Sequence, residues 1–313
     1  MWVLQIRSPC AQSIGSREST GSTPTKYSRL VVTRQPSKAN VDPRTVTGFG
    51  EEWSAYDQSE LDLDEAQTIF DKYFSLVDFT SFSSTSVAVD VGCGSGRWAR
   101  FVAPHVGTLH LVDPAAAALD VARRNLAERS NCRFHHAAVD ELPIPDESAD
   151  LVYSLGVLHH IPDTEAGIAS CVKKVRPGGA FLVYLYYRFD NRPRWFRILW
   201  SISDLGRRAI CRLPFSIRRA VTTAIAGLVY WPLARLAKAI GSRGRNVSAL
   251  PLSIYREASF YTMRTDALDR FGTRLEKRFT RDEIRVMLER SGLERIQFRP
   301  DEPLWCAIGY RPT

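Results

Sequence analysis

The sequence of 313 residues is informative first for what it lacks. Its six cysteines are scattered, at positions 10, 93, 132, 171, 211 and 306, and no two form a CxxC or CxxxC pair. This spacing argues against a zinc site or a disulfide framework and favours a reducing compartment. No apolar run reaches the roughly 18–20 residues needed to span a bilayer. The best stretch, residues 220–234, is short and contains Pro232. We therefore expect no metal site and a cytoplasmic protein.

The first 45 residues have few large apolar side chains and few acids, whereas Ser and Thr are abundant. Such a composition predicts disorder. The segment lacks the apolar centre of a secretory signal, but its basic, acid-poor character also fits a transit peptide. A flexible tail or a start assigned too early is favoured over a transit peptide, and all three interpretations stay open.

The formal charge of +8 is unevenly distributed along the chain. From Arg188 to Arg245, twelve arginines and one lysine face only Asp190 and Asp204, which gives this segment a net charge of +11. The rest of the chain is net negative. The basicity therefore bears on the partner of one segment and not on the whole protein.

Residues 86–187 alternate between short apolar runs and helical periodicity. The pattern predicts strands at 86–91, 108–112, 132–136, 151–155 and 180–187, helices at 97–102, 115–128 and 164–175, and a turn at the RPGG of 176–179. Strands that alternate with helices predict a parallel sheet covered by helices on both faces.

The C-terminal part returns to regular structure after a long interruption. Thr280 and Glu283 form a capping-box pattern at the start of a helix over 280–291, and Gly292 is placed as its C-cap. Two strands follow, at 293–299 and 304–310. We therefore expect four parts: a disordered tail (1–45), a core with an N-terminal lid (46–187), a basic helical cap inserted into it (188–274), and a C-terminal helix and β-hairpin that complete the core (275–313).

A glycine-rich loop follows the first predicted strand, in the stretch VAVDVGCGSGRWARF of residues 87–101. A dinucleotide fingerprint needs a third glycine at position 97, where this chain has Arg97. Asp90 would also place an anion beside two phosphates. S-adenosylmethionine (SAM) reverses the electrostatics, because it carries a sulfonium and an amino group and no phosphate. The loop therefore favours SAM over NAD or FAD.

A second acid, Asp113, ends the next predicted strand in the sequence LVDP. A carboxylate at this position can accept hydrogen bonds from both ribose hydroxyls. Ligands of open parallel sheets bind beyond the carboxyl ends of the strands, where Asp90 and Asp113 both fall.

Residues 87–187 resemble the class I SAM-dependent methyltransferases of the broad small-molecule type, the type 11-like family. The segments VDVGCGSGRWA, LVDP, VDELPIPDESADLVYSLGVLHHIPD and VKKVRPGGAFLVY follow the motifs of that family in order and at its spacing. The resemblance implies a Rossmann-like α/β fold with a seven-stranded, mainly parallel sheet. Its last strand is antiparallel and comes from the C-terminal hairpin.

The resemblance also implies which residues bind the cofactor SAM. They are Asp90, Gly92, Cys93, Gly94, Gly96, Asp113, Pro114, Val139, Asp140, Ser154 and Leu155. One position departs from the family, because Ala138 stands where an acid often accepts a hydrogen bond from the adenine amino group. Adenine would then rely on the backbone at Val139 and on apolar packing, with Asp140 as an alternative acceptor.

Two histidines in SLGVLHHIPD are the candidate general bases, because imidazole titrates near neutral pH. His160 matches the more regular position of the family, and His159 is the candidate for lying nearer the substrate. A histidine that only ties its loop to the backbone is the alternative. The residues SLGV at 154–157 lack the motif that grips a planar amide-like nitrogen, which argues against adenine-N6 or glutamine-amide methylation.

Three interpretations compete for the basic segment 188–274. The first is a helical cap with its arginines in water. The second is an amphipathic surface resting on an anionic membrane above a lipid-soluble acceptor, and the third is a nucleic-acid-binding surface. The last is weakest, because no RNA-binding module is recognisable, and no nucleic acid is expected. The membrane interpretation predicts an exposed face, beside an apolar edge, shared by arginines 207, 208, 218 and 219.

Further candidates flank the acceptor side. The connector before the final helix resembles one that closes over the acceptor in related enzymes, and the segment 46–60 resembles their lid. The candidates in the connector are Tyr261, Arg264, Asp269, Arg270 and Arg274, and those in the lid are Trp53 and Tyr56.

The sequence therefore predicts a SAM-dependent methyltransferase that acts on a small molecule, with O-methylation favoured over C- or N-methylation. A membrane-associated methyltransferase for a lipid or isoprenoid acceptor is the alternative among enzymes. A SAM-binding partner protein without catalysis is the alternative of another class, and the lack of an open acceptor cavity would favour it.

Overall fold

The computed structural model of the chain describes residues 39–189, 192–248, 250–300 and 305–313. The helices are α1 Pro43–Ala55, α2 Leu63–Tyr73, α3 Ala99–Val102, α4 Ala116–Asn125, α5 Thr164–Val172, α6 Arg194–Ile210, α7 Phe215–Ile225, α8 Trp231–Gly241, α9 Phe260–Gly272 and α10 Arg281–Arg290. The strands are β1 Val87–Val91, β2 Thr108–Asp113, β3 Cys132–His136, β4 Ala149–Leu155, β5 Val175–Leu185, β6 Glu294–Phe298 and β7 Trp305–Tyr310.

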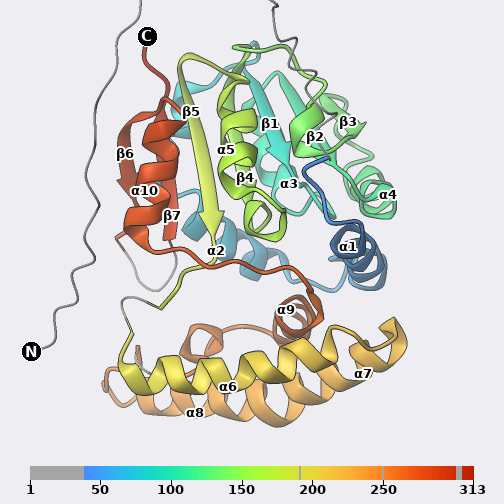
Figure 1. Cartoon of the computed structure of the whole chain (residues 1–313), viewed down its shortest axis with the longest axis vertical. Coiled ribbons are helices and arrows are strands. Elements are labelled where there is room, and N and C mark those ends of the chain that lie inside the picture. The colour runs from blue at the N-terminus through green and yellow to red at the C-terminus, as the bar shows by residue number, and fades with distance from the viewer. Residues whose placement is uncertain (1–38, 190–191, 249, 301–304) are drawn as a thin grey trace, which may run out of the picture. The chain divides into compact units, whose positions relative to one another are not determined.

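All seven strands form a single sheet in the order β3-β2-β1-β4-β5-β7-β6 (Figure 1). β1 pairs in parallel with β2 and β4, and β4 pairs in parallel with β5. β7 runs antiparallel to both of its neighbours, β5 and β6. This arrangement confirms the predicted mainly parallel, Rossmann-like sheet whose last strand is antiparallel.

The two faces of the sheet are covered by different helices because strand side chains alternate between the faces. Val89 and Val91 of β1 pack in a core that also takes in α5 and α10. Ala88, which precedes Val89, packs in the opposite core, with α2, α3 and α4. The arrangement of these layers can be followed in Figure 1. The carboxyl ends of β1, β2 and β4 are thereby held at one edge.

The lid begins earlier than the sequence predicts. Most of the expected disordered tail, residues 1–38, lies outside the described residues, but α1 already starts at Pro43 instead of after residue 45. Asp42 caps this helix by accepting a hydrogen bond from the backbone N–H of Thr45 at 3.0 Å. Proline is favoured in the first helical turn, because its missing N–H has no partner there in any case.

The predicted turn at RPGG is wrong, because these residues lie inside β5. The register with β4 passes from Ala149–Val175 directly to Leu151–Ala180, so the strand carries extra residues as a bulge. Gly178 takes a positive φ of 76° at this point. The preceding helix consequently ends at Val172, short of the predicted residue 175.

The C-terminal helix confirms its predicted caps. The Thr280 side chain accepts from the backbone of Glu283, and the Glu283 side chain accepts from the backbone of Thr280, which completes a capping box. Gly292, with a φ of 88°, follows the helix, and the Leu293 N–H bonds back to the Leu288 carbonyl. This geometry is a Schellman-type helix end.

Helices α6 to α9 form an insertion between β5 and α10 (Figure 1). α9 packs against α6, α7 and α1, so it connects the insertion to the lid. The apolar centre of the insertion consists of small and aromatic side chains, with Ala226, Tyr230 and Ala234 facing Met263 and Ala267 of α9. The chain then returns to the sheet, where Phe279 bridges to Tyr187.

Residues 215–241 form one continuous helical run through α7, a π turn at Ala226–Tyr230, and α8. The π turn ends two residues before Pro232, whose missing N–H would interrupt a regular α-helix. By length and composition, Phe215–Gly241 is apolar enough to cross a membrane, with a mean hydropathy of 1.3. The prediction that no such segment exists is therefore wrong.

The arginines of the insertion do not share one exposed face. Arg207 and Arg218 are buried, whereas Arg208 and Arg219 are exposed. Arg207 bonds to Asp204 at 2.6 Å and to the Thr273 carbonyl at 2.8 Å, which ties α6 to the end of α9. Arg218 ties α7 to α1 through Glu51 at 2.8 Å. The four-arginine face predicted from the sequence is wrong, because two of its members are structural.

Asp204 pairs with both Arg207 and Arg208, so it allows a matched test of the difference between a buried and an exposed arginine. Burial alone would raise its pKa, but hydrogen bonds from Arg207 and Arg208 outweigh burial and hold the pKa below its usual value. We expect Arg207→Ala to lower the free energy of unfolding by about 2–4 kcal/mol, because it removes the buried partner of the Asp204 carboxylate. Arg208→Ala, whose side chain is 63% exposed, should cost less than about 1 kcal/mol. Equal losses in urea denaturation would contradict the assignment.

Candidate functional site

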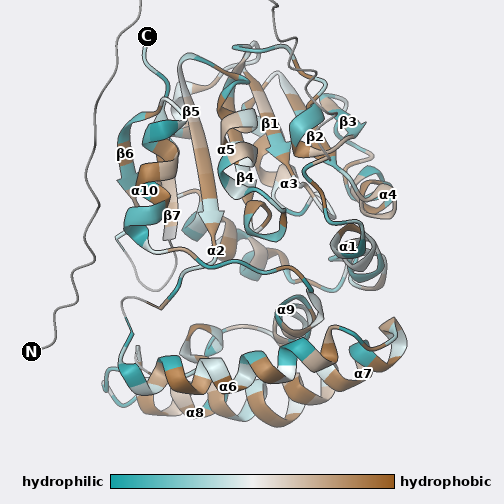
Figure 2. Cartoon of the chain, in the orientation of Figure 1, coloured by the Kyte–Doolittle hydropathy of each residue, from teal (hydrophilic) through white to brown (hydrophobic). Residues whose placement is uncertain are grey.

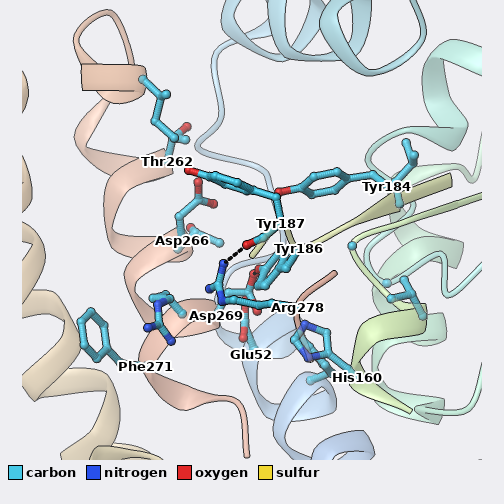
Figure 3. Close-up of a pocket in the computed structure, with 18 of the residues that line it drawn as sticks. Glu52, His160, Tyr184, Tyr186, Tyr187, Thr262, Asp266, Asp269, Phe271 and Arg278 are labelled. Atoms are coloured by element: carbon cyan, nitrogen blue, oxygen red, sulfur yellow. Dashed lines mark hydrogen bonds between the residues drawn. The ribbon is translucent and has the colours of Figure 1, made fainter. Parts of the chain in front are cut away.

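A cavity of about 760 Å³ lies at the carboxyl edge of the sheet and continues into the insertion. Its walls come from the glycine loop after β1, the end of β5, the lid helix α1, and helices α6 to α9. Figure 3 shows side chains from β5, α9 and α1 around this cavity, with His160 on the side away from α9. Segments far apart in the sequence therefore meet at one site.

The glycine loop needs glycine at several of its positions, and two of these line the cavity. Gly92 has a φ of 78°, and a Cβ there would lie 2.4 Å from a methyl group of Val157. Gly94 has a φ of 54°, and a Cβ there would lie 2.8 Å from the indole nitrogen of Trp53. Both glycines and Trp53 line the cavity, so the lid covers the loop as predicted for Trp53. Any ligand here approaches bare backbone.

Asp113, at the end of β2, is held by the loop that it faces. One carboxylate oxygen accepts the Gly94 N–H at 2.9 Å, and the other accepts the Ala115 N–H at 2.8 Å. Burial raises the pKa of Asp113 to about 6, so the group is mainly ionised at neutral pH. Each oxygen keeps a lone pair, and the residue lines the cavity.

Asp90 lies behind the loop and is not one of the residues that line the cavity. It is only 3% exposed, and its Oδ2 atom has no hydrogen-bond partner among the described residues. Burial raises the pKa of Asp90 to about 8. This carboxyl is mostly protonated at neutral pH unless a cation or a donor comes close.

The other predicted cofactor residues divide into two groups. Cys93, Pro114 and Leu155 line the cavity. The remaining four do not: Gly96, Val139, Asp140 and Ser154.

Two of these four have other partners in the structure. The Ser154 hydroxyl donates to the Val91 carbonyl at 2.9 Å, which joins two strands. Asp140 accepts the Asn40 N–H at 3.0 Å, which places the start of the lid segment.

His160 lines the cavity, and His159 does not. The Nδ1 atom of His160 lies 2.7 Å from the Leu275 carbonyl, so Nδ1 carries the proton and donates it. Nε2 has no hydrogen-bond partner among the described residues. Burial lowers the pKa of His160, which keeps the ring neutral at pH 7. His160 therefore keeps a buried, unprotonated Nε2 in a side chain that lines the cavity, while its loop is tied down.

His159 is fully buried and stacks on Tyr186, with ring centroids 3.9 Å apart. Neither ring nitrogen has a hydrogen-bond partner among the described residues, and burial lowers its pKa well below the usual value. The expectation that His159 lies nearer the substrate is corrected, because its ring turns into the aromatic packing beneath the loop.

Three acids that line the cavity come from α1 and α9: Glu52, Asp266 and Asp269 (Figure 3). Burial, followed by the charges of Asp269 and Asp266, raises the pKa of Glu52 well above its usual value. Burial raises the pKa of Asp266 to about 6. Asp269 accepts a short 2.5 Å hydrogen bond from Tyr186. The described residues contain no group of three or more metal-ligating side chains placed to hold an ion.

Sequence reasoning found Asp269 but missed Glu52, Asp266, Tyr184 and Tyr186. The spacing of the two acids on α9, one helical turn apart, and the tyrosine-rich end of β5 were the available signals. Of the five polar connector candidates, Asp269 and Arg270 line the cavity, whereas the remaining three do not.

Two of those three pair with residues of the lid segment. Tyr261 accepts the Gln58 N–H, and Arg264 pairs with Glu60. Tyr56 of the lid does not line the cavity and packs against Tyr261.

Comparison with known proteins places this site in a family. The family model described as a methyltransferase domain matches residues 89–183, which carry β1 to β5 and the glycine loop. An uncharacterized methyltransferase of Mycobacterium tuberculosis is 32% identical over 137 residues, which cover 44% of this chain and 69% of that protein.

Two relatives of named activity match shorter shares of their own length. Phosphoethanolamine N-methyltransferase 2 of Caenorhabditis elegans is 33% identical over 111 residues, 34% of this chain and 25% of that protein. A ubiquinone biosynthesis O-methyltransferase of Aromatoleum aromaticum is 27% identical over 142 residues, 45% of this chain and 61% of that protein.

Among solved structures, human N-acetylserotonin methyltransferase in complex with SAM aligns with a TM-score of 0.48 and 15% identity, over 85% of this chain and 57% of that chain. The glycine loop, the acid that ends β2, the strand order and the relative matched over two thirds of its length lead to one conclusion. This chain belongs to the class I SAM-dependent methyltransferases.

Proposed function

We propose that this enzyme transfers a methyl group from SAM to a hydroxyl oxygen of a small-molecule acceptor. The observation that carries the proposal is His160, a residue that lines the cavity and whose buried, unprotonated Nε2 has no hydrogen-bond partner among the described residues. A hydroxyl loses a proton when it is methylated, so it benefits from a base at this position. The similarity to ubiquinone biosynthesis O-methyltransferases supports the same chemistry.

The residues of the glycine loop and of β2 fit SAM better than a dinucleotide. Asp90 and Asp113 are both buried acids, and burial raises the pKa of each, so a nearby positive charge stabilises them and a phosphate does not. We assign the ribose hydroxyls to the free lone pairs of Asp113. We assign the methionine part to the bare backbone of Gly92 and Gly94, with Asp90 acting on its amino group through water.

The chain contributes alignment, exclusion of water and a base. SAM, when bound, supplies an electrophilic methyl group on a positively charged sulfur. Trp53 over Gly94 and the aromatic end of β5 keep water from the cavity. Tyr186, fixed by its hydrogen bond to Asp269, orients the acceptor hydroxyl. His160 Nε2 takes the proton of that hydroxyl as its oxygen gains the methyl group.

The cavity supports catalysis over a purely SAM-binding role. It continues well beyond the glycine loop, to Trp200, Leu233 and Ile254 of the insertion. This space is larger than a cofactor site beside the loop requires, so an acceptor has room. The lack of such a cavity would favour a non-catalytic SAM-binding protein, so the presence of the cavity argues against that alternative.

Asp113 allows a direct test of cofactor binding. We expect Asp113→Ala to weaken SAM binding by about 1–3 kcal/mol, because hydrogen bonds to a charged group are lost. Asp120→Asn on the exposed side of α4 is the control and should bind SAM as the wild type does. Isothermal titration calorimetry measures both. Unchanged affinity in Asp113→Ala would contradict the assignment of the ribose site.

Asp90 predicts a release of protons when SAM binds. With a pKa of about 8, its carboxyl is largely protonated at pH 7, and a cation brought close lowers that pKa. Binding at pH 7 should therefore release up to about one proton, and less as the pH rises above 8. Calorimetry in buffers of different ionisation enthalpy measures the number. Asp90→Asn should abolish the release, and an equal release from this variant would contradict the role of Asp90.

His160 predicts a separation of catalysis from binding. We expect His160→Gln to lower kcat by roughly 10²–10⁴-fold, the usual contribution of a general base, with SAM affinity unchanged. Because burial lowers its pKa, the acid limb of the wild-type rate profile should lie below the ordinary histidine range. A screen of hydroxyl and amine acceptors with methyl-labelled SAM supplies the assay. Product labelled on nitrogen, or full activity of His160→Gln, would contradict the proposal.

A further inference from the structure

Most exposed large apolar side chains of the described residues gather on the insertion. Thirteen of fifteen lie between residues 195 and 254: Trp195, Ile198, Leu199, Ile202, Leu205, Ile217, Leu228, Val229, Trp231, Leu233, Leu236, Leu250 and Ile254. We call these thirteen residues the apolar face. Figure 2 shows hydrophobic positions all along α6, α7 and α8. Folded proteins rarely leave so much apolar surface in water, so a partner is expected to cover it.

Helix α6 presents its apolar stripe outward. Ile198, Ile202 and Leu205 recur at helical spacing and are each more than 60% exposed. The opposite side of the helix carries the buried pair of Asp204 and Arg207, which points to α9. An amphipathic helix normally buries its apolar side, so this inverted orientation requires an apolar environment outside the chain.

The long helix 215–241 lies along such an environment and does not cross it. One of its sides packs on α9 through Ala226, Tyr230 and Ala234, which are at most 7% exposed. Crossing a bilayer would strip these contacts away. The other side exposes Leu228, at 79%, and Leu236, at 54%. A helix with one side in protein and the other in lipid lies in the plane of the membrane interface.

The four-arginine face expected for a membrane-bound enzyme is not formed, but exposed cations still accompany the apolar face. Arg194 and Arg197 on α6, Arg219 on α7 and Arg245 after α8 are exposed, and none has a carboxylate partner among the described residues. The segment 188–245 carries a net charge of +11. Such charges are attracted to anionic lipid headgroups and have no comparable attraction to a neutral apolar partner. Charge and apolarity together favour an anionic membrane.

The cavity reaches the apolar face. Five members of the face also line the cavity: Leu199, Val229, Leu233, Leu250 and Ile254. The other end of the same cavity is lined by Gly94 and Asp113. A molecule that enters between these five side chains therefore passes from the covering surface to the glycine loop without crossing water.

We propose that the apolar face docks on an anionic bilayer and that the acceptor enters the cavity from it. The acceptor is then an amphiphile, with a methylatable polar head at the glycine-loop end and an apolar tail along the five shared side chains. The part that concerns the acceptor rests on the proposed function, whereas the docking face does not.

Vesicle flotation of the full chain tests the docking face. Wild type should float with vesicles of phosphatidylcholine and phosphatidylglycerol in roughly equal amounts, and much less with phosphatidylcholine alone or at high salt. The triple variant Ile198→Glu, Ile202→Glu, Leu205→Glu should partition at least roughly tenfold more weakly, because it places charges in the apolar layer. These side chains are already in water in the free protein, so its melting temperature should not change.

Leu63→Glu is the matched control, since Leu63 on α2 is 57% exposed but lies outside the apolar face. It should float as the wild type does. Flotation of the triple variant equal to wild type, or no flotation of the wild type on anionic vesicles, overturns the docking face. A dimer in solution that the triple variant converts to monomer, without flotation, identifies a second copy as the occupant and also overturns it.

Methyl-labelled SAM tests the route of the acceptor. Wild type is incubated in parallel with vesicles made from an organic-solvent lipid extract of cells and with the water-soluble extract of the same cells. The lipid extract should yield labelled product in the organic phase. Labelled product from the water-soluble extract alone overturns the lipid acceptor. Calorimetric binding of SAM separates the two proposals. A chain that binds SAM but does not float contradicts only the docking face, and one that floats without binding SAM contradicts only the proposed function.

Discussion

Two carboxyl groups buried at the carboxyl ends of β1 and β2 are the constraint on which the rest of the site depends. Asp113 lines the cavity and Asp90 lies behind the glycine loop, and burial makes the ionised form of each costly. Two backbone N–H groups offset part of that cost for Asp113, whereas one oxygen of Asp90 has no partner. A bound cation would relieve this imbalance, which is the basis on which we propose that the site prefers a sulfonium donor to a phosphate-bearing nucleotide.

The insertion between β5 and α10 connects this electrostatic site to its surroundings. Its buried arginines, Arg207 and Arg218, hold α6 and α7 against α9 and the lid. Its exposed arginines and the residues of the apolar face lie at the surface, and five residues of that face also line the cavity. One segment thus closes the cavity and also forms the surface through which we propose that the acceptor arrives. The stability of the cap and access to the site depend on different faces of the same helices.

Local sequence patterns predicted the part of the site that one short segment builds. The glycine loop needs Gly92 and Gly94 for backbone reasons, and Asp113 follows directly from the end of a strand, so both are readable without a structure. The caps of α10 could be predicted for the same reason, whereas the antiparallel last strand followed from the resemblance to a family. The RPGG bulge could not, because its glycines fit a turn equally well, and only pairing with β4 decides between them.

These local patterns could not predict which residues of distant elements come into contact. Glu52 and Asp266 reach the cavity only because α1 and α9 pack together, which no spacing in the sequence encodes. Arg207 and Arg208 are neighbours of identical type, yet the position of α9 buries one and leaves the other in water. In the same way, adjacent His159 and His160 differ because the loop turns one ring inward and leaves the other at the cavity.

The most direct test of the central claim is the carboxyl carbon NMR titration of Asp90 in the protein without and with SAM. The account predicts a pKa near 8 in the free protein that falls by more than one unit when SAM is bound. A carboxyl that titrates near 4 in the free protein, or one whose titration SAM leaves unchanged, would contradict it.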